Sequence, residues 1–189
     1  MTCDLDVRQT LRKMVAPRHR ELDSQRCFHI LRGQGDITRD RYASALLALY
    51  SPHVALETEI LKSIQAYDVD YDFAPRADAL LSDLTALGYA PECTQTAAVS
   101  DSLPALLGVL YVLEGGKRGS VHIERQLLAQ APQLPTSFFS AGHQLDSLDP
   151  FWGLLERHAT DGDFSHHVCL AACQTFDLFI DSAKHYSRI

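Results

Sequence analysis

The stretch LYVLEGGKRGSVHIERQLL, from Leu110 to Leu128, begins and ends like an apolar helix. Its middle departs from that pattern, because small residues occupy four of six consecutive positions: Gly115, Gly116, Gly119 and Ser120. A glycine inside a helix costs about 1 kcal/mol relative to alanine. The small residues in this helix therefore call for a structural or functional explanation.

Gly115 and Gly119 are four residues apart and share one helical face, which Ser120 extends. Such a face permits close packing against another helix, or a flat apolar ligand lying against the backbone. The spacing alone leaves both explanations open. A phosphate-binding loop is excluded, since it needs glycine five positions before the Gly-Lys pair and Ser or Thr after it, where Tyr111 and Arg118 stand.

The rest of the chain shows the three- and four-residue apolar spacing of α-helices. The spacing is clearest over residues 11–22, 42–54, 80–87 and 168–183. Alternating β-branched runs, which are typical of strands, are absent. The sequence therefore predicts an all-α protein with six or seven helices in one domain that spans residues 1–189.

Local signals place several helix ends. Thr38 is expected to cap the second helix, and Gly88 to follow the end of the third. Asp149-Pro150 reads as the cap and first residue of a later helix. Pro17 and Pro52 lie within helical patterns, so each is expected to kink or break its helix.

Composition narrows the class of protein. The chain has 189 residues, 46% apolar and 22% charged, as in ordinary globular proteins. The net charge of −7 argues against a nucleic-acid-binding protein. The N-terminal sequence has no apolar signal segment, and no apolar run is long enough to span a membrane. The five cysteines include no CxxC pair and do not suggest a disulfide framework. We expect a cytoplasmic protein with no nucleic-acid or membrane partner.

Histidine and cysteine patterns are less distinctive. Cys169 and Cys173 share one helical face, which fits metal binding or, more commonly, thiols packed in a core. His19 lies on the first helix, and its spacing alone is that of an ordinary surface or core histidine.

Two segments taken together resemble the heme oxygenase family, its bacterial branch in particular. HRELD, from His19 to Asp23, is similar to the proximal motif of that family, and LGVLYVLEGGKRGS, from Leu107 to Ser120, to its distal-helix motif. The resemblance covers essentially the whole chain. It implies a single heme oxygenase-like domain with heme between the first helix and a glycine-kinked distal helix.

The resemblance also implies roles for individual residues. His19 would be the axial ligand of the heme iron, and Asp23 would accept a hydrogen bond from its other ring nitrogen. Arg12 would bind a heme propionate. Further residues would line the heme or reach a propionate, although core packing explains the phenylalanines equally well: Tyr111, Phe176, Phe179 and Lys184.

On the distal side, the resemblance places Gly115, Gly116, Gly119 and Ser120 in the catalytic surface, where bare backbone steers dioxygen toward a meso carbon of the porphyrin. Two positions depart from the family motif. Gly116 stands where relatives carry Ser or Asp, and it lacks the side chain that, when acidic, helps to hold a distal water network. Ser120 stands where a second glycine is usual. A third oddity is Pro17, which would bend the proximal helix near His19.

The activity implied is the O₂-dependent cleavage of heme to biliverdin, carbon monoxide and ferrous iron. The electrons would come from an external ferredoxin or reductase, because the chain carries no flavin or nicotinamide motif; this electron-donor protein is the expected partner. The main alternative is a heme sensor, store or carrier on the same fold without turnover. A lesser one is an all-α enzyme with a non-heme substrate, which would leave His19 and Arg12 without roles.

Overall fold

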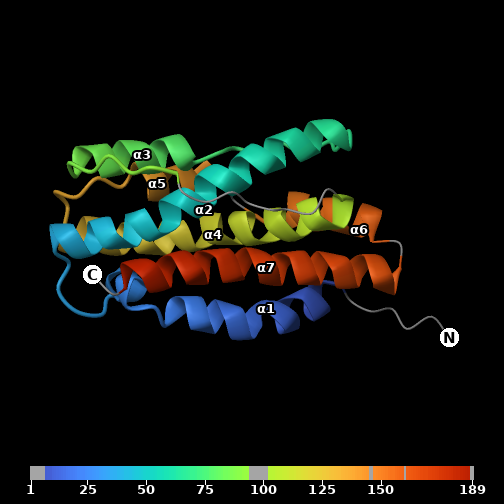
Figure 1. Ribbon diagram of the computed structural model, residues 1–189, viewed down its shortest axis with the longest axis horizontal. Helices are drawn as coiled ribbons and strands as arrows, with labels where there is room; N and C mark the ends of the chain where they lie inside the picture. The colour runs from blue at the N-terminus through green and yellow to red at the C-terminus, as the bar shows by residue number, and fades with distance from the viewer. Residues whose placement is uncertain (1–6, 94–101, 145–146, 160, 188–189) are drawn as a thin grey trace.

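The computed structural model describes residues 7–93, 102–144, 147–159 and 161–187, and these residues form helices and connecting segments without a β-strand (Figure 1). The elements are α1 (Val7–Asp23), η1 (Arg26–Arg32), α2 (Arg39–Ala66), α3 (Ala77–Ala86), α4 (Leu103–Gln130), α5 (Ser137–Ser140), η2 (Ala141–Gln144), α6 (Asp149–His158) and α7 (Gly162–Tyr186), where η marks a 3₁₀ helix. The prediction of an all-α fold is confirmed.

None of the helices in these ranges is long and apolar enough to cross a membrane.

Helix α7 is the centre of the packing, since it contacts α4, α1 and α2 along its length (Figure 1). Gly108 lets α4 approach α7 closely. A Cβ atom on Gly108 would lie 2.5 Å from the Val168 carbonyl oxygen and 2.6 Å from the Ala171 Cβ. This glycine is therefore required by helix packing.

Buried apolar side chains form two clusters. One is built mainly from α1, α4, α6 and α7, and the other mainly from η1, α2, α3 and α5, while α2, α4 and α7 contribute to both. The cavity described below draws residues from both, for example Phe179 from the first and Phe28 from the second. The cavity thus lies where the two parts of the core meet.

The predicted helix ends are largely correct. Thr38 caps α2 by accepting a hydrogen bond from the Arg41 N–H, 3.3 Å away. Gly88 follows α3 with a φ of 78°, in the left-handed region that favours glycine. Asp149, predicted as a cap, is instead the first residue of α6, with Leu148 at the cap position.

Neither internal proline breaks its helix. Helix α1 continues through Pro17 to Asp23, and α2 continues through Pro52 to Ala66. A break, one of the two predicted outcomes, does not occur, because a proline removes a single backbone hydrogen bond. Pro52 is buried, and the packing of α2 against its neighbours outweighs that loss. The other outcome, a kink, stays a prediction.

Candidate functional site

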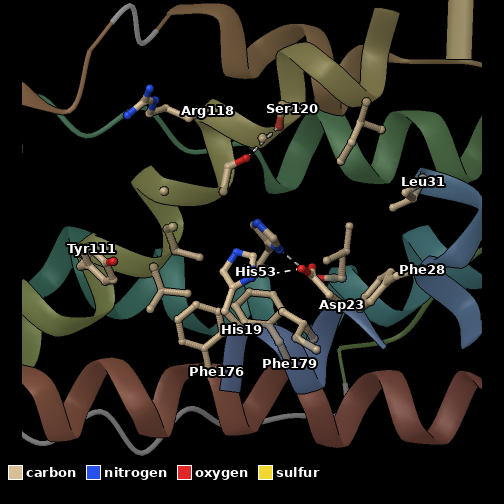
Figure 2. Close-up of a pocket in the computed structure, with 18 of the residues that line it drawn as sticks. His19, Asp23, Phe28, Leu31, His53, Tyr111, Arg118, Ser120, Phe176 and Phe179 are labelled. Carbon is tan, nitrogen blue, oxygen red and sulfur yellow. Dashed lines mark hydrogen bonds and ion pairs between the residues drawn. The ribbon is translucent and has the colours of Figure 1, made fainter. Parts of the chain in front are cut away.

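A cavity of about 400 Å³ opens between α4 on one side and α1 and α7 on the other. Figure 2 shows Ser120 across this cavity from Phe176 and Phe179 of α7. The volume is within the range of small-molecule and cofactor sites. The apolar side chains in its wall are Leu22, Phe28, Leu31, Leu49, Val112, Leu113, Ile123, Phe138, Phe139, Leu148, Trp152, Phe176 and Phe179.

His19 of α1 stands in the wall of the cavity, with its ring 5.6 Å from the ring of Phe176 between centroids. Its Nδ1 lies 3.2 Å from Asp23 Oδ2, one helical turn away (Figure 2). When Nδ1 carries the proton and donates a hydrogen bond to this carboxylate, the lone pair is on Nε2. The structure thus brings together the two residues that the sequence paired.

Asp23 is also held from the other side. Arg32 Nη1, from η1, lies 3.1 Å from the same Oδ2 atom that faces His19. A carboxylate with two partners has a fixed orientation, so Asp23 fixes the imidazole in turn. Arg32 was not among the site residues expected from the sequence.

The glycine face of α4 forms the opposite wall. Gly115 and Gly119 line the cavity, and a Cβ atom on either would meet no other part of the described chain within 4 Å. Close packing against another helix therefore does not explain them, in contrast to Gly108. Helix α4 nevertheless runs through them without interruption. Of the two explanations left open by the sequence, the structure favours a surface kept bare for a ligand.

The remaining two distal residues meet a side chain that the sequence did not single out. Ser120 Oγ accepts a hydrogen bond of 2.8 Å from Arg76 Nη1 and donates one of 3.1 Å to the Gly116 carbonyl oxygen. Arg76 precedes α3 and is 3% exposed, yet its side chain lines the cavity. No local sequence signal marks it, because the tertiary fold alone brings it to α4.

His53 is a second residue of the cavity wall that the sequence analysis missed. It lies on α2, buried, with Nδ1 2.8 Å from the Leu49 carbonyl oxygen. Burial first, and then the positive charges of Arg76 and Lys117, lower the pKa of His53 to about 3. The imidazole is therefore neutral at physiological pH. Its one signal in the sequence was its position four residues after Leu49 in an apolar pattern.

Arg12 and Tyr111 both line the cavity, as the resemblance implied. The Arg12 guanidinium lies 5.4 Å from the centre of the Trp152 ring, and the Tyr111 ring lies 5.7 Å from the same ring. Burial raises the pKa of the Tyr111 hydroxyl, so this group stays protonated. Trp152, whose ring lies beside both the Arg12 and the Tyr111 side chains, was not among the predicted site residues.

Lys184 lies apart from the other predicted site residues. Its Nζ pairs with Glu21 at 2.8 Å on the exposed surface, and it does not line the cavity. Phe176 and Phe179 do line it. Cys169, one of the two cysteines considered for metal binding, is packed in the apolar core with Cys173.

The cavity is positively charged although the protein is acidic. Four arginines stand in its wall, namely Arg12, Arg32, Arg76 and Arg118. Asp23 is the single acidic residue among the described residues that line it. The site combines an apolar interior with guanidinium groups, which fits a flat apolar ligand that carries carboxylates.

The fold is that of a known enzyme. The solved structure of heme oxygenase from Leptospira interrogans superimposes with a TM-score of 0.76 over 96% of this chain and 100% of that one, at 18% sequence identity. No protein-family model and no curated protein matches the sequence. The comparison, together with the helical architecture, shows that this protein has the helical fold of heme oxygenase.

Proposed function

We propose that the protein binds heme in this cavity and cleaves it, with O₂ and external electrons, to biliverdin, carbon monoxide and ferrous iron. The observation that carries the proposal is the bare backbone at Gly115 and Gly119, which faces open space across the cavity from His19. Glycine at two positions inside a helix is costly, and no other part of the described protein packs against either of them. A ligand bound against this face would explain the two glycines.

The chemistry of the donor set fits heme. Because the Asp23 carboxylate holds His19 Nδ1, His19 would bind the heme iron through the lone pair of Nε2. The cation-rich wall, above all Arg12, fits the two propionates of heme. The apolar residues of the wall fit the porphyrin ring.

Each wall then has its own task. Asp23 and Arg32 fix the orientation of the imidazole on the proximal side. The glycine face lets α4 lie close to the ring and excludes bulky side chains from the distal side. When bound, heme supplies both the iron that activates dioxygen and the carbon that is oxidised. Because the chain shows no flavin or nicotinamide motif, the electrons come from a separate ferredoxin or reductase.

A heme-binding protein without turnover remains the second candidate. The specific observation in its favour is the distal wall itself, where Gly116 offers no side chain and Ser120 is bonded to a cation. The fold is compatible with either function.

A single-turnover experiment decides between these functions. Purified protein is mixed with hemin and a reductant in air, and its visible spectrum is followed. We expect a Soret band that disappears as a biliverdin band grows. A Soret band that persists would overturn the enzyme and support the binding protein, and the absence of any heme complex would overturn both.

The axial role of His19 is tested by His19→Ala, with His122→Ala as a matched control on α4. His122 does not line the cavity. We expect the first change to abolish or displace the histidine-ligated spectrum and the second to leave it unchanged. An unaltered spectrum in His19→Ala would refute the axial assignment.

A further inference from the structure

The buried guanidinium of Arg76 is the least expected group in the cavity. Its backbone N–H lies 3.0 Å from both Oε1 and Oε2 of Glu57, and the Ala77 N–H donates to Glu57 Oε2 at 2.8 Å. The guanidinium carbon lies 4.4 Å from the centre of the Phe138 ring. The backbone and the side chain of Arg76 are thus both fixed in place.

Ser120 holds the far end of this side chain at the glycine face. It accepts from Arg76 Nη1, and its own hydroxyl donates to the Gly116 carbonyl. Ser120 is confined in turn by η2, because a Cβ atom on Gly142 would lie 2.7 Å from the Ser120 Cβ. Positions 116 and 120, which depart from the family motif, therefore both lie beside Arg76.

Arg76 keeps its charge, and no carboxylate neutralises it directly. Burial lowers the pKa of Arg76 to about 10, opposed by the charges of Glu57 and Glu114, so it is a cation at neutral pH. Glu57 uses its oxygens on backbone N–H groups, while Glu114 pairs with Lys117 at 2.9 Å. Among the described residues, no carboxylate forms an ion pair with the Arg76 guanidinium.

A guanidinium has five N–H groups, and the hydrogen bond to Ser120 occupies one of them. A buried cation that lacks an ion-pair partner and lines a cavity attracts a small anion. Here the cation borders the face of α4 that, on the proposed function, covers the distal side of the heme.

We propose that Arg76, positioned by Ser120, forms a binding site for a small anion on the distal side of the cavity. An anionic ligand of the ferric heme iron, such as fluoride or azide, accepts a hydrogen bond from the guanidinium there. A neutral ligand such as carbon monoxide gains much less. This inference rests on the proposed binding of heme, but not on turnover.

Gly116 provides a way to cancel this charge without deleting Arg76. A Cβ atom at position 116 would lie 3.7 Å from Arg76 Nη2, at ordinary contact distance. The carboxylate of Gly116→Asp would extend beyond that Cβ and pair with the guanidinium. Gly116→Ala is the matched control, since it adds the Cβ without the charge.

The test measures fluoride binding to the ferric heme complex by visible absorption, and carbon monoxide binding to the ferrous complex of the same variants. We expect Arg76→Met and Gly116→Asp to weaken fluoride binding at least about tenfold, as for loss of a hydrogen bond from a charged donor. Ser120→Ala, which releases the guanidinium, should weaken it by a smaller factor. Carbon monoxide affinity should change by less than about threefold in all of them.

Two further variants control for charge and size. Arg39→Met removes an arginine whose guanidinium bonds the Leu87 carbonyl oxygen and does not line the cavity, so fluoride affinity should be unchanged. Gly116→Ala, which adds bulk to the distal surface without charge, should bind fluoride more tightly than Gly116→Asp. A Gly116→Ala variant as weak as Gly116→Asp would show that bulk, rather than charge, is responsible, and would overturn the proposal.

The outcomes separate this inference from the proposed function. Wild-type protein that binds and cleaves heme, with fluoride affinity unchanged in Arg76→Met and Gly116→Asp, would overturn the anion site alone. Loss of fluoride affinity in these variants without heme cleavage in the wild type would support the anion site and overturn the enzyme. Should Arg76→Met not fold, Gly116→Asp and Ser120→Ala carry the decision in the same way. Failure of the wild type to bind heme would overturn both.

Discussion

The bare face of α4 leads to a prediction in which stability and ligand binding change in opposite directions. Gly119 lines the cavity, and a Cβ atom there would meet nothing in the described protein within 4 Å. In the ligand-free protein, Gly119→Ala should therefore gain helix propensity, up to about 1 kcal/mol. For a chain of this length, that gain raises Tm by roughly 2–4 °C.

The same methyl group should obstruct heme. If the ligand lies against the glycine face, the added Cβ forces the kind of overpacking that costs about 1–3 kcal/mol, or roughly 5- to 150-fold in Kd. Tm is measured on the ligand-free protein by circular dichroism, and Kd by titration with hemin at the Soret band. The ligand-free protein becomes more stable while its heme affinity falls.

Gly108→Ala is the matched control, because it is the same substitution on the same helix. Its Cβ would lie 2.5 Å from the Val168 carbonyl oxygen, so it should destabilise the protein by about 1–3 kcal/mol and lower Tm. A Gly119→Ala variant that loses stability as Gly108→Ala does would show that position 119 is packed by the protein itself. Unchanged heme affinity in Gly119→Ala would show that no ligand lies on this face.

Other residues of the site and its surroundings give further predictions. Arg12→Met should weaken hemin binding at least about tenfold through loss of a propionate partner, and an unchanged Kd in the hemin titration would remove Arg12 from the site. Lys184→Ala should leave hemin Kd unchanged, since Lys184 pairs with Glu21 outside the cavity; a weaker complex would return it to the site. His53 is buried with its pKa lowered to about 3, so the unfolded chain takes up the proton first as pH falls below 6.5. The contribution of His53 to the free energy of unfolding is therefore complete above pH 6.5 and declines toward pH 3. The loss between pH 7.5 and pH 5 is about 2 kcal/mol. Urea unfolding at these two pH values should show a smaller acid-induced loss in His53→Gln than in the wild type, and equal losses would contradict the burial of a neutral imidazole.

Local patterns were sufficient for the helices. Apolar spacing predicted the all-α fold, and Thr38 and Gly88 marked helix ends correctly because capping depends on residues close in the chain. The same reasoning predicted a kink or a break at Pro17 and Pro52, and no break occurs, since both helices continue. The cost of an internal proline is local, but the packing that compensates for it is not.

The contacts of the candidate site also fall into local ones and long-range ones. His19 and Asp23 lie one turn apart on α1, and the resemblance to the heme oxygenase family already implied their pairing. Arg76 and Ser120 are 44 positions apart and meet only because the segment before α3 folds against α4. Trp152, Arg32 and the other missed residues come from elements whose contacts have no short-range signature.

The sequence by itself determined that the chain is helical, that α4 carries a bare glycine face and that an imidazole and a carboxylate share one turn of α1, because each depends on residues within a few positions. The tertiary structure decided what those features mean. Gly108 and Gly119 look alike in the sequence, yet one lies against the backbone of α7 and the other faces an open cavity. The surroundings of a side chain depend on which distant segments pack beside it, and spacing along one helix holds no record of them.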